Sequence, residues 1–101
     1  MTVFFLEILP RLPAGTFVQV HDVCLPFDYP DDMVQRVYSE HYLLAADLLA
    51  RGSAEHVLLP NALVSNDREL AGVLAPVWDA IGDPRVVRGG SSFWFRVPPR
   101  P

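Results

Sequence analysis

Residues 16–30, TFVQVHDVCLPFDYP, constrain the fold of this chain more than any other stretch. The stretch begins as an apolar strand and then presents His21 and Asp22 before a proline-flanked turn. Both faces of the strand are largely apolar, which is typical of a central or near-central parallel strand covered on both sides. Polar side chains that follow such a strand lie at the rim of the sheet, where open α/β sheets bind ligands. We therefore expect the functional site at this end of the strand.

The rest of the chain alternates helices with strands. Pro60 and Asn61 interrupt the second strand, which places it near a sheet edge. Asn66 followed by Glu69 gives the third helix a start that resembles a capping box. The alternation predicts an α/β sheet with three strands and three helices. Apolar spacing predicts the helices over residues 3–12, 31–51 and 65–81, and the strands over 16–24, 55–64 and 91–97.

Length, charge and cysteine content exclude several classes of protein. A chain of 101 residues forms at most one small domain. Its net charge of −4 disfavours nucleic-acid binding, which depends on basic patches. The single cysteine, Cys24, excludes an internal disulfide and suits a reducing compartment. Apolar runs stay well short of the roughly 20 residues of a membrane span. We expect a cytoplasmic protein that binds neither nucleic acid nor a membrane.

Five stretches carry a resemblance to a known family. The chain is similar to the C-terminal half of a class I S-adenosylmethionine-dependent methyltransferase, and in particular to a bacterial group with a motif of the form HDIFLPFDYP. The most specific sequence motifs are His-Asp-x-x-x-Pro-x-x-Tyr-Pro and Gly-Gly-Ser-Ser-Phe-Trp. The five stretches follow the family order: LEILPRLPAG (6–15), VQVHDVCLPFDYP (18–30), EHYLLAADLLA (40–50), VLLPNALVS (57–65) and GGSSFWFRV (89–97).

The resemblance implies part of a Rossmann-like methyltransferase sheet. Residues 17–23, 57–64 and 91–97 would be the family's fifth, sixth and seventh strands, in the spatial order 5-7-6 with the seventh antiparallel. The cofactor would be S-adenosylmethionine. In the family a glycine-rich loop and an acidic strand end bind this cofactor, and neither has a counterpart here, because we expect those elements to lie before Met1. Gly89 and Gly90 precede a strand rather than a helix, so they are not a phosphate cradle. We expect residues 1–101 to be a single partial domain, inactive without an N-terminal half.

His21 and Asp22 are the candidate catalytic residues. A histidine with a near-neutral pKa suits a general base that takes a proton from a methyl-accepting hydroxyl or amine. Two other interpretations stay open. The pair could bind a divalent ion together with Asp28, or the two side chains could cap the backbone of the loop. We assign no metal ligand and no cofactor ligand.

Asp28, Tyr29 and His41 are the candidate substrate-binding residues. Asp28 and Tyr29 follow the strand in a loop, where they either line an acceptor pocket or simply form the turn. His41 falls on the apolar stripe of its helix, which favours a packed histidine. The family resemblance instead places this helix over the site as a lid-like insertion.

Two further functions compete with methyl transfer to a small-molecule acceptor. The apolar content of 50% is high for a chain of this size. It favours a non-catalytic α/β domain that associates with a partner, or with a second copy, through the exposed edge of the 17–23 strand. The third alternative is an independent small α/β module that binds an unrelated ligand.

Overall fold

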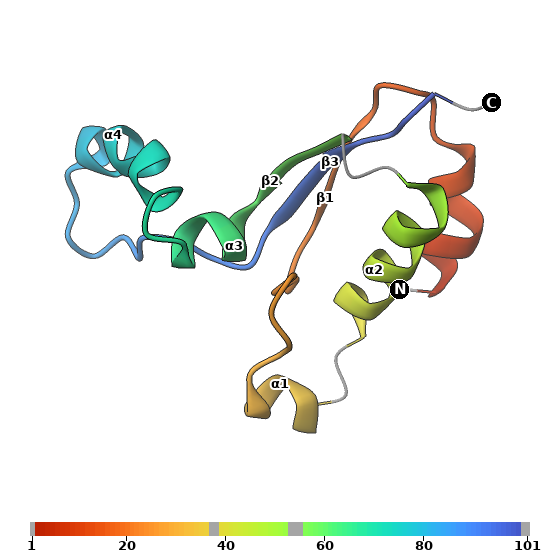
Figure 1. Ribbon diagram of the computed structural model, residues 1–101, viewed down its shortest axis with the longest axis horizontal. Coiled ribbons are helices and arrows are strands. Elements are labelled where there is room, and N and C mark those ends of the chain that lie inside the picture. Colours follow the sequence, from red (N-terminus) through yellow and green to blue (C-terminus); the bar gives the residue numbers. More distant parts are fainter. Residues whose placement is uncertain (1, 37–38, 53–55, 100–101) are drawn as a thin grey trace.

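A sheet of three short strands forms the centre of the chain. The computed structural model describes residues 2–36, 39–52 and 56–99. The strands are β1 (Phe17–Val20), β2 (Val57–Pro60) and β3 (Phe93–Arg96). β3 lies between the other two and runs antiparallel to both, in the order β1-β3-β2 (Figure 1). The chain is therefore α/β, as the alternation of elements predicts.

The prediction of a central parallel strand covered on both faces is wrong for the described part of the chain. There β1 pairs with β3 alone, with Val18 opposite Phe95 and Val20 opposite Phe93. Val18 and Val20 are buried, whereas Phe17 on the other face is 64% exposed. The sequence pattern was misleading because Phe17 is apolar and nevertheless lies on an open face, where the Arg96 guanidinium covers it at 5.3 Å from the ring centroid.

The core lies on one face of the sheet. The N-terminal helical segment consists of a π-helical turn, η1 (Phe4–Ile8), and a 3-10 turn, η2 (Leu9–Arg11). This segment and helix α2 (Glu40–Arg51) lie side by side along the sheet (Figure 1). The buried apolar cluster is formed by Phe5, Leu9, Val18, Val20, Val23, Leu44, Phe93, Phe95 and Val97.

The helix predicted over residues 31–51 is two helices. α1 is Asp31–Gln35 and α2 begins at Glu40, with residues 37–38 outside the described part. Ser39 starts the second helix, since its carbonyl accepts from the amides of Tyr42 and Leu43 and its own amide donates to the Glu40 carboxylate at 3.1 Å. Gly52 ends α2 in the left-handed conformation (φ 61°).

The strand predicted over residues 55–64 also divides. β2 ends at Pro60, and Asn61 begins helix α3 (Asn61–Asn66). Pro60 is the last strand residue, and the Asn61 amide still donates to the Ser92 carbonyl at 3.1 Å where α3 begins. Residue 55 lies outside the described part.

Helix α4 (Ala71–Ile81) starts later than predicted, and its N-cap, Leu70, makes no side-chain cap hydrogen bond. Asp67 instead closes the turn before the helix. The Asp67 carboxylate accepts from the amides of Glu69 and Leu70, both at 3.0 Å. The predicted cap, Asn66, instead donates to the Ala62 carbonyl at 2.7 Å and so closes α3. None of residues 71–81 is buried, and α4 projects away from the sheet (Figure 1). This projection makes the molecule elongated, 42 × 33 × 21 Å.

Candidate functional site

The loop that leaves β1 carries the predicted catalytic pair outside the ladder. His21 is exposed and Asp22 is half-buried. Asp22 adopts a left-handed backbone (φ 58°), which aspartate tolerates better than most residues other than glycine. The next residue, Val23, is fully buried and its amide donates to the Ser91 carbonyl at 2.8 Å. The turn at Asp22 therefore holds both polar side chains at the end of β1 while the chain remains attached to the segment that leads into β3.

His21 and Asp22 line a shallow cleft of about 360 Å³ between β1, the N-terminal segment and the start of α2. Gln19, two residues earlier on the same side of the strand, places its Nε2 3.2 Å from His21 Nδ1. A half-turn of the amide would present its oxygen to Nδ1–H instead. In that arrangement the proton of the neutral His21 ring is on Nδ1. His21 Nε2 is then a free acceptor, as a general base requires. The geometry therefore permits His21 to act as a base through its Nε2 when the Gln19 amide oxygen accepts a hydrogen bond from His21 Nδ1–H.

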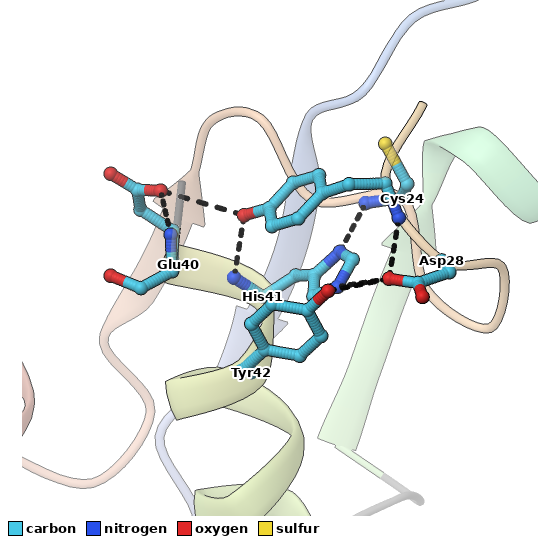
Figure 2. Close-up of polar contacts among 7 residues, drawn as sticks. Cys24, Asp28, Glu40, His41 and Tyr42 are labelled. Atoms are coloured by element: carbon cyan, nitrogen blue, oxygen red, sulfur yellow. Dashed lines mark hydrogen bonds and ion pairs between the residues drawn. The ribbon is translucent and has the colours of Figure 1, made fainter. Parts of the chain in front are cut away.

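His41 is the centre of a second, buried group of side chains. It is 1% exposed and stacks on Tyr29 with ring centroids 3.6 Å apart and planes 7° from parallel. The ring of Tyr42 meets His41 edge-on at 4.3 Å (Figure 2). Tyr29 comes from the loop after β1, whereas His41 and Tyr42 come from the first turn of α2. The stack therefore joins the loop to the helix.

Two contacts determine which ring nitrogen of neutral His41 carries the proton. The Cys24 amide donates to Nδ1 at 3.4 Å, and Nε2 lies 3.7 Å from Asp28 Oδ1. Because Nδ1 accepts, the proton of the neutral ring is on Nε2, facing the carboxylate. Burial lowers the pKa of His41 below its ordinary value of 6.5, against the opposing fields of Asp28 and Glu40. A second proton would also have to enter at Nδ1, where the Cys24 amide already points.

Asp28 is held by one of its two carboxylate oxygens. Its Oδ1 accepts from the Tyr42 hydroxyl at 2.6 Å and from the Tyr29 amide at 2.8 Å. The Tyr42 hydrogen bond is the main reason why the pKa of Asp28 lies below its ordinary value, and the same bond raises the pKa of Tyr42. Asp28 is therefore a fixed anion at neutral pH.

Tyr29 and Glu40 connect the two groups. The Tyr29 hydroxyl accepts from the His41 amide at 3.0 Å and donates to Glu40 Oε2 at 3.4 Å. Glu40 in turn lines the cleft that contains His21 and Asp22. Burial raises the pKa of Tyr29 to about 12, so this phenol keeps its proton. Burial, with smaller contributions from Asp22 and Asp28, likewise raises the pKa of the Cys24 thiol and makes it a poor nucleophile.

The structure thus brings three of the five predicted site residues together. Asp28, Tyr29 and His41 form one cluster, and His21 and Asp22 lie in a neighbouring cleft. His41 is packed, as its position on the apolar stripe indicates. Within the residues that the structure describes, no three His, Cys, Asp or Glu side chains gather as metal ligands would, so the alternative metal site with Asp28 is not assembled there.

Sequence reasoning missed the roles of Tyr42 and Glu40. Both flank His41 in the tripeptide Glu-His-Tyr, but neither lies on the apolar stripe of the helix, which includes His41. A signal was nevertheless present, because Asp28-Tyr29 and Glu40-His41-Tyr42 combine acids, phenols and an imidazole that can satisfy one another.

Comparison with known proteins gave no match of any of three kinds: no protein-family model, no curated protein and no solved structure matches the chain. Among the helices of the described residues, none is both long and apolar enough to cross a membrane.

Proposed function

We propose that this chain is the acceptor-side portion of a class I S-adenosylmethionine-dependent methyltransferase. The arrangement of the sheet is the observation that carries the proposal. β3 lies antiparallel between β1 and β2. This order supports the 5-7-6 arrangement that the sequence resemblance implies. The other edge of β1 has no partner among the described residues, and it could receive the parallel strand of a cofactor-binding half.

In this proposal His21 acts as the general base for a hydroxyl or amine acceptor, and Asp22 lies beside it. Their position after the last residue of β1 is where open α/β sheets bind ligands. Asp28, Tyr29 and His41 belong to the acceptor side. His21 is exposed and is thus accessible to an acceptor, whereas His41 is buried and neutral and holds the loop that carries Asp28.

The described residues do not fit S-adenosylmethionine itself. A cofactor cradle needs open space beside its glycines, but a Cβ on Gly89 would come within 2.8 Å of Ser65 Cβ. Gly89 is close to protein, not to a ligand-sized space, and the loop after β1 has no glycine at all from His21 to Pro30. In this proposal the cofactor is therefore bound by residues other than these.

The proposal is tested first by calorimetry with S-adenosylmethionine. We expect no measurable binding to the purified 101-residue chain, and tight binding would contradict the proposal. The DNA upstream of the start codon is expected to continue in frame with a strand, a glycine-rich turn and a helix. The extended product should transfer labelled methyl groups, and His21→Ala should reduce the rate by about 10²–10⁴-fold, the usual contribution of a general base. His56→Ala is the matched control and should retain activity.

A second function is favoured by the same open edge. A non-catalytic domain would use the free edge of β1 to pair with another chain. The neighbouring sheet face is also exposed at Phe17 (64%) and Trp94 (41%). If this function is correct, size-exclusion chromatography with light scattering should show concentration-dependent association. Phe17→Lys, on the open face of this edge strand, should reduce the association. A clean monomer at high concentration would exclude self-association.

A further inference from the structure

A cleft on the other side of Asp28 has the chemistry of a cation site. It has a volume of about 390 Å³, within the range of small-molecule pockets. Its walls come from the loop after β1, from α3 and from the segment before β3, and they include Phe27, Asp28, Asn66 and Ser91. It is distinct from the cleft that contains His21, with which it shares no lining residue.

Asp28 is the one charged residue among those that line this cleft. Its hydrogen bonds from Tyr42 and Tyr29, and the approach of His41, all involve Oδ1. Oδ2 receives no hydrogen bond from the described part of the chain, and Figure 2 shows it pointing away from the stack. The side chain is 74% exposed. The aromatic cluster thus fixes a carboxylate and leaves one oxygen ready for a ligand.

The remaining lining favours a group that donates several hydrogen bonds and has an apolar body. Asn66 uses its amide nitrogen on the Ala62 carbonyl, which leaves its oxygen as an acceptor. Ser91 is a further polar residue of the lining. An ammonium group has three donors and no acceptor, so it matches a carboxylate with neutral acceptors nearby. The ring of Phe27, 45% exposed, offers a surface for the apolar part of the ligand or for the cation itself.

We propose that this cleft binds the ammonium group of a small amine, with Asp28 as the counter-ion and Phe27 beside the carbon skeleton. An anion would meet the charge of Asp28 without a compensating cation in the lining. A divalent metal would find a single carboxylate there, whereas Ca²⁺ and Mg²⁺ sites combine several oxygen ligands. The inference goes beyond the proposed function, because this cleft is distinct from the cleft that contains His21, and amine binding requires no methyl transfer.

The test is titration of the ¹⁵N-labelled chain with benzylamine at pH 7, followed by NMR. Benzyl alcohol, which has the same ring without the charge, is the matched ligand. We expect benzylamine to bind at least tenfold more tightly, with the largest shifts at Phe27, Asn66 and Ser91. Asp28→Asn keeps an acceptor for Tyr42 and should abolish the preference for the amine. Asp32→Asn removes the same charge from α1, outside the cleft, and should retain the preference.

Three results would overturn the proposal. They are equal binding of amine and alcohol by the unmodified chain, an unchanged preference in Asp28→Asn, and displacement of benzylamine by an equal concentration of Mg²⁺. Phe27→Ala provides a second variant that leaves the hydrogen bonds of Asp28 intact, and it should weaken both ligands together. Because S-adenosylmethionine takes no part, these results are independent of the methyltransferase tests.

Discussion

Replacing His41 with alanine is expected to lower the free energy of unfolding by about 2–4 kcal/mol at pH 7.5. The substitution removes a ring that is 1% exposed and stacked on Tyr29, so it leaves a cavity between the loop and α2. It also removes the acceptor for the Cys24 amide. Urea unfolding followed by circular dichroism measures the loss. The result would show that the site loop depends on this histidine for its position.

The same histidine predicts how stability depends on pH. Its pKa is lowered in the folded state, so the unfolded chain takes up a proton first as the pH falls. Stability is therefore complete above pH 6.5 and declines below it, with a limiting slope of about 1.4 kcal/mol per pH unit. Asp28 and Glu40, the charged groups that face the ring, raise the pKa of His41 and so oppose the effect of burial. They narrow the pH range over which the folded and unfolded chains differ in the protonation of His41. The pKa of Asp28 is also lowered, which adds a further loss of stability only below pH 3.8.

The His41→Ala variant should lack the decline in stability that begins as the pH falls below 6.5. The difference in stability between the unmodified chain and His41→Ala should therefore shrink as the pH falls from 7.5 to 5. His21→Ala is the matched control, since His21 is exposed, and it should change stability by less than about 0.5 kcal/mol and keep the slope. If the slope survived in His41→Ala, the buried neutral histidine would not be its source.

Local patterns in the sequence located the strands but not their ends. The strand predicted over residues 16–24 contains β1, which ends earlier, at Val20, directly before the polar pair His21 and Asp22. The glycine stops after α2 and α4 are predictable from local patterns: Gly52 and Gly82 both adopt the left-handed conformation that ends a helix.

Features that depend on distant residues could not be predicted in this way. The apolar spacing runs on through residues 31–51, so it does not show the break that Ser39 and Glu40 introduce. The hydrogen bond between Tyr42 and Asp28 joins residues 14 positions apart, and the spacing of apolar residues in the sequence does not predict such a contact. The pattern of β1 likewise could not distinguish a covered face from an open one, because Phe17 is apolar on the exposed side.

Gly89→Ala should destabilise the fold by about 3 kcal/mol or more, through strain and overpacking together. Gly89 has φ 109°, and an added Cβ would lie 2.8 Å from Ser65 Cβ. Ser65 cannot easily move, because its hydroxyl donates to Asn61 at 2.7 Å and Asn61 donates to the Ser92 hydroxyl at 3.1 Å. These bonds connect α3 to the segment that enters β3. Urea unfolding measures the loss of stability.

Gly15→Ala separates the two causes. Gly15 also has a positive φ, 86°, but an added Cβ there meets nothing within 4 Å. It should therefore show the cost of backbone strain alone, about 1–3 kcal/mol. A larger loss at Gly89 would mean that this glycine is required for packing against α3, and that the space beside it is not available to a cofactor phosphate. Equal losses at the two positions would show that Ser65 yields, and the space beside Gly89 would then be open to a ligand after all.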